Sequence, residues 1–272
     1  MKKILVPTDL TEVAAQATSQ AAIIAKKANA GLTLLHVLDS RSAPESTVTP
    51  LLKEQANNIS LRYRIECDFI VNKGNIFETI PAIARSADYF LIVIGTHGIK
   101  GIKQILMGAN ILKLVMKIGI PVMVVQKETP LIESFDRMIL PVSSHDSFKV
   151  QIEAATLFAS LFNTEIHLYS IHKAGYEWPE QLKKNIEDAA RIFESRNIRM
   201  KRVKEEQNVY SVGYAKQTLK YAESVSANLI SIMSVSSTEY YYFAQLDKES
   251  MLLNEPRIPI LCCSGLPEEE HI

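Results

Sequence analysis

The sequence predicts an α/β fold of two tandem domains, each with a mostly parallel five-stranded sheet and helices on both of its faces. One observation is that strand-like and helix-like patterns alternate along the chain. Another is that short runs such as "FLIVI" and "VMVV" are apolar and branched, as strands covered on both faces should be. The third is an internal repeat with a domain-sized period of about 135 residues.

The repeat is visible in pairs of apolar segments. They are "ILVPTD" and "MILPVS" (4–9, 138–143), "LTLLHVLD" and "TEIHLYSIH" (32–39, 164–172), "LIVIGTHG" and "LISIMSVS" (91–98, 229–236), and "IPVMVV" and "IPILCC" (120–125, 258–263). The second of these pairs matches His36 with His167. We therefore expect domains at residues 1–126 and 137–266, joined by the polar stretch 126–136.

Each domain is expected to alternate strands and helices. In the first, strands are expected at 4–8, 32–38, 62–71, 89–94 and 121–125, and helices after Thr11, over 76–87 and over 108–118, with a loop at 39–47. Thr11 is a good N-cap residue, and an apolar stripe from Val13 to Ala28 follows it. Pro81 should start, kink or interrupt its helix.

Composition and charge exclude several classes of protein. Lys plus Arg and Asp plus Glu number 30 each, which argues against a general binder of nucleic acid or of anionic membranes. No apolar run approaches the roughly 20 residues of a membrane span. The N-terminal "MKKILVPTDL" does not have the pattern of a signal peptide, so a cytoplasmic protein is expected. Cys67, Cys262 and Cys263 are expected to be buried, reduced thiols.

A cluster of glycines is the first candidate site. Four of the ten glycines lie in "GTHGIKGIKQILMG" (95–108), between a predicted strand and a predicted helix. Glycines let the backbone approach phosphate oxygens, and a helix N-terminus supplies free N–H groups. Asp9, at the end of the first strand, can accept hydrogen bonds from ribose hydroxyls. An ordinary strand–turn–helix connection is the alternative interpretation.

The spacing G-x-x-G-x₉-G, with "KILVPTD", "LLHVLD" and "IPVMVV", resembles the universal stress protein family in a tandem two-domain form. The resemblance implies Rossmann-like (adenine nucleotide alpha hydrolase-like) domains that bind ATP or another adenine nucleotide, with or without Mg²⁺. It also implies a homodimer formed through sheet-edge strands. The residues that it implies at the nucleotide site are Pro7, Thr8, Asp9, Val37, Ile94, Gly95, His97, Gly98, Gly108, Ala109 and Asn110.

One position departs from the family pattern, which has Ser or Thr after the last glycine where this chain has Ala109. A hydrogen bond to a charged group contributes about 1.5–3 kcal/mol, so its loss would weaken binding roughly ten- to hundredfold. Asn110 could supply an amide donor. We expect binding that is weak, or that favours AMP or ADP over ATP.

The second domain lacks the candidate residues. Asp9 corresponds to Ser143, and the three glycines of the pattern correspond to Met233, Ser236 and Leu246. One nucleotide site per chain is therefore expected. The aromatic stretch Tyr240–Phe243 is either an interface anchor or a self-packed loop.

No catalytic or metal-binding constellation is predicted. His97 has no carboxylate or second histidine at a useful spacing, and His36 is expected to be a hydrogen-bonded core residue. The leading hypothesis is a stress-response protein that binds a nucleotide without turning it over. The alternatives are a slow ATP hydrolase, which the absence of G-x-x-x-x-G-K-[ST] disfavours, and a dimerisation module without nucleotide.

Overall fold

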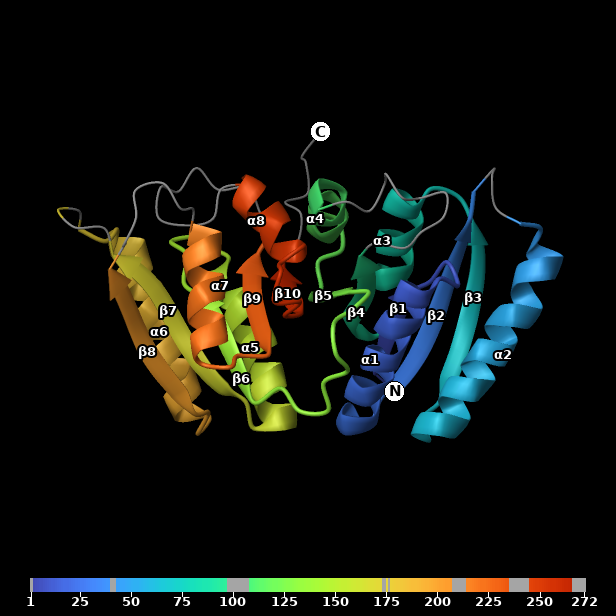
Figure 1. The fold of residues 1–272 in the computed structure, drawn as a ribbon, viewed down its shortest axis with the longest axis horizontal. Helices are drawn as coiled ribbons and strands as arrows, with labels where there is room; N and C mark the ends of the chain where they lie inside the picture. The colour runs from blue at the N-terminus through green and yellow to red at the C-terminus, as the bar shows by residue number, and fades with distance from the viewer. Residues whose placement is uncertain are drawn as a thin grey trace. The chain divides into compact units, whose positions relative to one another are not determined.

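The computed structural model describes residues 2–39, 43–96, 108–172, 175, 177–206, 214–234 and 245–265, with the backbone alone at 108, 109 and 245–247. The chain divides into two compact units, Met1–Glu133 and Ser134–Gly265. Both have the expected α/β architecture (Figure 1). The domain limits 1–126 and 137–266 stay a prediction.

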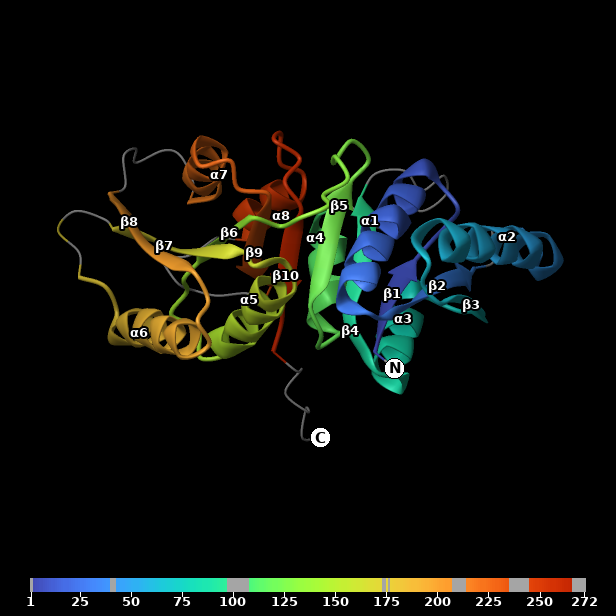
Figure 2. The ribbon, with the colours of Figure 1, turned by 90° about the horizontal axis from the view of Figure 1, so that it is seen from below.

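The first unit is an open parallel sheet with helices on both faces. Its elements are β1 (Lys3–Pro7), α1 (Glu12–Ala28), β2 (Gly31–Leu38), α2 (Glu45–Tyr63), β3 (Cys67–Lys73), α3 (Ile76–Ser86), β4 (Tyr89–Thr96), α4 (Gly108–Met116) and β5 (Val122–Gln126). The strand order is β3-β2-β1-β4-β5, and the pairs are parallel. Figure 2 shows α1 and α2 on one side of the sheet and α3 on the other, as right-handed crossovers require.

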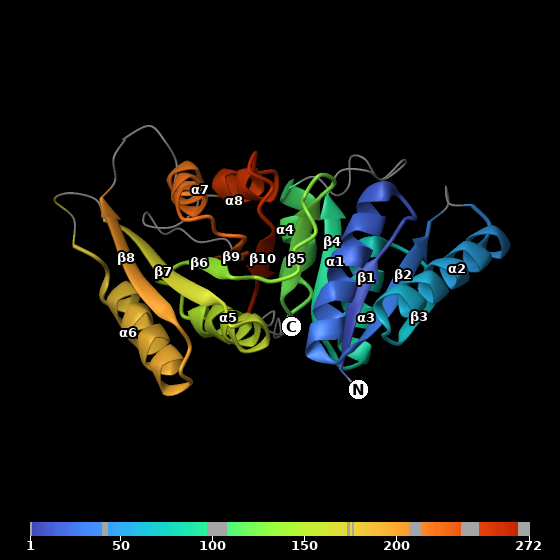
Figure 3. The ribbon, with the colours of Figure 1, turned by 60° about the horizontal axis from the view of Figure 1, so that its bottom comes forward.

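The second unit repeats this topology. Its elements are β6 (Arg137–Pro141), α5 (Phe148–Phe162), β7 (Glu165–His172), α6 (Glu180–Ser195), β8 (Met200–Glu206), α7 (Tyr214–Ser224), β9 (Leu229–Met233), α8 (Gln245–Leu252) and β10 (Ile260–Cys263). The strand order is β10-β9-β6-β7-β8, again with parallel pairs. Helices α5 and α6 cover one face, and α7 and α8 cover the other (Figure 3).

The strand registers correct one expected correspondence between the halves. Pro7 lies opposite Leu35, and Pro141 lies opposite Tyr169. Counting back along β2 and β7 from these pairs, His167 takes the position of Thr33. The expected match between His36 and His167 is therefore wrong. It paired the two residues because both are histidines, whereas the strand registers make Thr33 the equivalent of His167.

Helix α1 forms where the sequence predicts it. The Thr11 hydroxyl caps the helix by accepting a hydrogen bond from the Ala14 N–H at 3.4 Å. The helix ends at Asn29, which adopts a left-handed conformation with a φ of 49°. The predicted apolar stripe is buried from Val13 to Ile24, whereas Ala28 is only half-buried. This face packs on β1 and β4, and the Val13 end of α1 lies against the carboxyl end of β4.

Helix α2 is the main correction to the predicted elements. The sequence pattern suggested a loop at 39–47 and a strand at 62–71, but α2 spans Glu45–Tyr63 and β3 spans Cys67–Lys73. The helix contains Pro50 in its second turn, and its apolar stripe is narrow. The buried residues Val48, Leu52, Ala56 and Ile59 follow helical spacing, which is the signal that could have revealed it.

The segment between the two predicted domains is packed rather than loose. Gln20 of α1 donates to the Ile132 carbonyl at 3.0 Å and accepts from the Ile132 N–H at 2.8 Å. In the second unit, Phe135 is fully buried and meets Phe158 and Phe162 of α5 edge-on. The polar stretch 126–136 thus makes hydrogen bonds within the first unit at Ile132 and core contacts within the second unit at Phe135.

The cysteines are free, and two of them are fully buried in β10. Burial raises the pKa of Cys263 to about 12, and it raises the pKa of Cys262 as well. Cys67 is only half-buried, although desolvation also raises its pKa to about 12. These thiols therefore remain protonated near neutral pH and are poor nucleophiles.

None of the helices in the described part of the chain combines the length and apolar character that a membrane span needs.

Candidate functional site

The candidate site lies at the carboxyl edge of the first unit's sheet, between β1 and β4. The strand order reverses there, since β2 and β3 continue from β1 in one direction while β4 and β5 lie in the other. The β1–β4 pairing ends at Leu5 and Ile92, although the strands continue to Pro7 and Thr96. Open α/β sheets place ligands at such a reversal, beyond the carboxyl ends of the strands.

The turn after β1 holds Asp9 in a fixed orientation. Oδ1 of Asp9 accepts hydrogen bonds from the Thr11 N–H at 3.2 Å and from the Thr11 hydroxyl at 2.6 Å. The Thr8 hydroxyl accepts from the Leu10 N–H at 3.1 Å, and Leu10 has a φ of 64°. That φ is uncommon for a branched side chain, so the surrounding contacts must impose it. Both hydrogen bonds of Asp9 to described residues use Oδ1, which leaves Oδ2 to accept from a ligand hydroxyl.

His36 supports the same turn from β2. Its Nδ1 lies 2.8 Å from the Thr8 carbonyl oxygen, which can only accept, so Nδ1 carries the proton. The Thr8 N–H in turn donates to the Leu35 carbonyl at 2.8 Å. His36 is therefore the buried, hydrogen-bonded residue that the sequence predicts, but its role in positioning Thr8 and Asp9 was not foreseen. Val37 is buried, and Pro7 is half-buried at the end of β1.

Gly95 at the end of β4 has a packing role that the sequence does not reveal. A Cβ atom at this position would lie 2.7 Å from the Val13 carbonyl oxygen and 3.0 Å from the Val13 carbonyl carbon. The α1 backbone therefore passes too close for any side chain here. Its neighbour Ile94 is buried on the opposite face of the sheet, because successive residues of a strand point to opposite sides. Glycine at position 95 is explained by helix–sheet packing, with or without a ligand.

The rest of the glycine stretch is only partly described. His97 and Gly98 lie outside the described residues, as does the aromatic stretch Tyr240–Phe243. Helix α4 begins at Gly108, as predicted, and its first turn, which includes Ala109 and Asn110, forms the positive end of the helix dipole. Such an end favours an anion.

An ion pair that the sequence did not suggest lies beside this edge. Nζ of Lys127, just after β5, lies 2.7 Å from Oε2 of Glu12 in the first turn of α1. The Lys127 ammonium donates to Glu12 and holds the pKa of that carboxyl below its usual value. Both side chains are largely exposed, so the pair stabilises the fold little. In the described residues, no group of three or more His, Cys, Asp or Glu side chains could hold a metal ion.

In the second unit, side chains of the protein itself occupy the turn equivalent to Thr8–Thr11. Ser143 replaces Asp9 and is buried. Asn185 of α6 donates to the Ser143 carbonyl at 2.7 Å and to the His145 carbonyl at 3.0 Å. Met233, which replaces Gly95, is also buried. The turn is therefore fastened to α6, and it carries no carboxylate toward the edge of the sheet.

Trp178 covers the carboxyl end of β7. Its indole N–H donates to the Ile171 carbonyl at 3.2 Å, and its ring meets His172 edge-on. Nζ of Lys204 lies 5.1 Å from the ring centroid, within range of a cation–π interaction. Ile171 is the register equivalent of Val37. The Trp178 ring thus lies at the carboxyl edge of the second unit's sheet, which is equivalent to the edge that holds the candidate site in the first unit.

The fold and the site geometry define a two-unit α/β protein with parallel sheets. Residues 1–126 match the model of the universal stress protein family. The first half of the chain is therefore similar to a universal stress protein domain, and the second unit repeats its topology. A universal stress protein of Methanocaldococcus jannaschii is 27% identical over 140 residues, which are 46% of this chain and 82% of that protein.

One solved structure shows the same fold over nearly the whole chain. The crystal structure of a universal stress protein from Archaeoglobus fulgidus aligns with a TM-score of 0.73 and 18% identity, covering 98% of this chain and 97% of that one. A universal stress protein in complex with cAMP aligns with a TM-score of 0.38 and 17% identity, covering 47% of this chain and 98% of that one.

Proposed function

We propose that this protein binds an adenine nucleotide in its first unit and acts in the stress response by binding rather than by turnover. The observation that carries the proposal is the Asp9–Thr11 turn at the β1–β4 reversal, where a carboxylate is held with Oδ2 available. The α4 N-terminus supports it, because the positive end of a helix dipole favours phosphate. The proposed site comprises Pro7, Thr8, Asp9, Val37, Ile94, Gly95, His97, Gly98, Gly108, Ala109 and Asn110. We propose a cytoplasmic location and a homodimer formed through sheet-edge strands.

The first test is the stoichiometry of binding. Purified protein should release an adenine nucleotide on unfolding, or show a thermal shift with ATP, ADP or AMP. Equilibrium titration should then give one site per chain, because Trp178 and Asn185 cover the equivalent edge of the second unit. Two equivalent sites, or the absence of both released nucleotide and thermal shift, would contradict the proposal. Steady phosphate release from Mg-ATP that depends on Asp9 would instead indicate a hydrolase.

Asp9→Asn should weaken nucleotide binding about tenfold, because the amide keeps the turn's size but loses the charged acceptor. Isothermal titration calorimetry measures the change. The matched control is Ser143→Ala, which alters the equivalent turn of the second unit and should leave the affinity unchanged. Equal effects of the two variants would place the site elsewhere.

Ala109→Thr should strengthen nucleotide binding by about tenfold or more, since it adds the hydroxyl of the family pattern beside the phosphates. Ala109→Val is the control, because valine has nearly the shape of threonine without the hydroxyl. Comparison of the two dissociation constants isolates the hydrogen bond. An equal affinity of the two variants would show that no phosphate contacts this position.

A further inference from the structure

The first unit's sheet ends in an outer strand, β3, whose far edge has no strand beside it in the described part of the chain. Its seven residues, Cys67–Lys73, pair with β2 in one continuous register, without a bulge. Such an edge can accept a further strand through main-chain hydrogen bonds. The strands at the inner ends of the two sheets are less accessible, because β5 is buried except at Gln126 and β10 is buried throughout. The described edges open to a partner are therefore those of β3 and of its equivalent β8.

The hydrogen bonds at the two ends of β3 determine which of its backbone groups point outward. The Leu32 N–H donates to the Glu66 carbonyl at 2.9 Å. At the other end, the Gly74 N–H donates to the Leu38 carbonyl at 3.0 Å. Successive residues of a strand direct their N–H and C=O groups to opposite edges, so the even-numbered residues of β3 bond to β2. The residues that present both groups outward are Cys67, Phe69, Val71 and Lys73.

A second copy of β3 matches this edge when the two strands run antiparallel about Ile70. Outward groups meet only where odd-numbered residues face each other, and this centre is the one that pairs all four of them. The facing pairs are then Cys67 with Lys73, Phe69 with Val71, Asp68 with Asn72, and Ile70 with Ile70. None of these pairs sets like charges opposite each other, so the strand is complementary to itself.

Apolar side chains at this edge are incompletely covered within one chain. Phe69, Ile70 and Val71 are each only partly buried. Helix α2 packs on one face of β3 and carries Leu51 and Leu61, which are 48% and 79% exposed. A twofold axis through Ile70 would keep the α2 helices of both copies on the same face of the joined sheet. Pairing therefore removes apolar surface from water at the strand and brings exposed leucines near the interface.

Strand β8 has the equivalent place in the second unit, but its charges oppose self-pairing. The Ile166 N–H donates to the Arg199 carbonyl at 2.9 Å, so here the even-numbered residues of the strand point outward. Every antiparallel register that pairs three or more of them sets Arg202 or Lys204 opposite its own copy, or opposite each other. Like charges directly opposite each other are destabilising, and charged side chains are a common protection of strand edges.

The carboxylates of β8 do not offset these cations, because they have partners inside the unit. Glu205 accepts from the buried Tyr169 hydroxyl at 2.7 Å, and Oε2 of Glu206 lies 2.9 Å from Nδ1 of His172.

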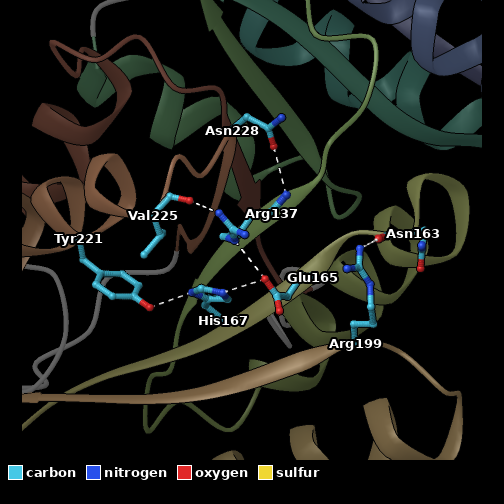
Figure 4. A network of polar contacts seen from close by, with 8 residues as sticks. All are labelled: Arg137, Asn163, Glu165, His167, Arg199, Tyr221, Val225 and Asn228. Atoms are coloured by element: carbon cyan, nitrogen blue, oxygen red, sulfur yellow. Dashed lines mark hydrogen bonds and ion pairs between the residues drawn. The ribbon is translucent and has the colours of Figure 1, made fainter.

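A further cation lies at the start of this edge. Figure 4 shows the Arg199 side chain, just before β8, directed at the Asn163 carbonyl, to which it donates. The register equivalent of Arg199 in the first unit is Glu66. The β3 edge thus lacks the row of cations that protects β8.

We propose that two copies of this chain associate through β3, antiparallel and centred on Ile70, and that the charged edge of β8 prevents the same pairing there. The partner is a second copy, because the edge is complementary to itself in both main-chain groups and charge. This inference rests on the homodimer of the proposed function and is independent of its nucleotide. The interface is isologous, so each contact between two different residues occurs twice.

Val71→Pro tests the strand assignment. Proline at position 71 removes an outward N–H but no hydrogen bond to β2, so the unit can still fold. Symmetry doubles the loss, and the dissociation constant of the dimer should rise about tenfold or more. Lys204→Pro is the matched control, since Lys204 is the register equivalent of Val71 on β8, and it should leave the constant unchanged. Sedimentation equilibrium of the full-length protein measures the constants.

The outcomes separate this inference from the proposed function. A native protein that is monomeric would overturn both the β3 interface and the homodimer, while the nucleotide titration stands apart. A native dimer whose dissociation constant is the same in both proline variants would keep a homodimer but overturn the β3 assignment.

Ile70→Cys in a Cys67→Ser background tests the register, also where Val71→Pro does not fold. Facing residues between hydrogen-bonded pairs lie about 4.5 Å apart at Cα, within the range of a disulfide. Mild oxidation should therefore link two copies, as seen by non-reducing electrophoresis. Asn72→Cys in the same background is the control, because it lies about 13 Å from its own copy in this register. The other two native cysteines are fully buried. Failure of Ile70→Cys to link, or equal linking of the two variants, would overturn the proposal.

Discussion

Phe135→Ala should lower the free energy of unfolding of the second unit by about 3–5 kcal/mol, the range for truncating a fully buried aromatic side chain. Phe135 is 0% exposed, and its ring centroid lies 5.2 Å from that of Phe158 and 5.1 Å from that of Phe162. Its removal leaves a cavity and two edge-to-face contacts without a partner. Trp178 is the only tryptophan of the chain, so its fluorescence during denaturant unfolding reports on this unit alone.

The control for this experiment is Leu131→Ala in the same connecting segment. Leu131 is 40% exposed, so its truncation should change the stability by less than about 0.5 kcal/mol. If Phe135→Ala shifted the fluorescence midpoint no more than Leu131→Ala, the segment before β6 would not belong to the core of the second unit.

Gly95→Ala should destabilise the first unit by about 3 kcal/mol, at the upper end of the range for overpacking, because the added carbon meets a main-chain oxygen that cannot turn away. The distance to the Val13 carbonyl oxygen would be 2.7 Å. Relief requires α1 to move from β4, and α1 begins at the turn that holds Asp9. Circular dichroism during denaturant unfolding measures the loss, and weaker nucleotide binding should accompany it.

Gly31→Ala is the matched control, since Gly31 also lies in a buried strand of the same sheet. The nearest atom to a Cβ there is a side-chain carbon of Lys3 at 3.3 Å, which can shift. The two variants add the same methyl group and should differ by about 2 kcal/mol or more. Similar unfolding midpoints would mean that α1 yields easily, and that the glycine at position 95 has a different explanation.

The sequence predicted most of the fold because most buried strands are continuous apolar runs, and four strands of each half appear as matching segments of the repeat. Helix α2 was missed because Pro50 and a narrow apolar stripe weaken its helical pattern. The alternating pattern in 62–71 predicted a strand that begins too early, since α2 continues to Tyr63 and β3 begins at Cys67. That alternation begins in the last turn of the helix. Packing of α2 on β3 decides which side chains of the helix are buried, and local periodicity does not reveal this tertiary contact.

The candidate site was predictable only in its motif residues. Asp9 and the start of α4 could be located from spacing, and both lie at the carboxyl edge of the sheet. The support that His36 gives to Thr8 depends on the pairing of β1 with β2. The need for Gly95 depends on how closely α1 crosses β4. Each of these depends on residues distant in the chain, which only the folded structure brings together.

The indole of Trp178 on the Ile171 carbonyl has a thermodynamic consequence for the whole chain. A ligand that binds only the native form stabilises it by mass action, in proportion to the logarithm of its free concentration when that exceeds the dissociation constant. Under the proposed function, this coupling acts on the first unit alone. In the second unit, the Trp178 side chain lies at the equivalent edge in place of a ligand. Its effective concentration never changes, because it is part of the chain. The melting of one half of the molecule should therefore follow the nucleotide supply, while the other half keeps a constant melting temperature at fixed pH.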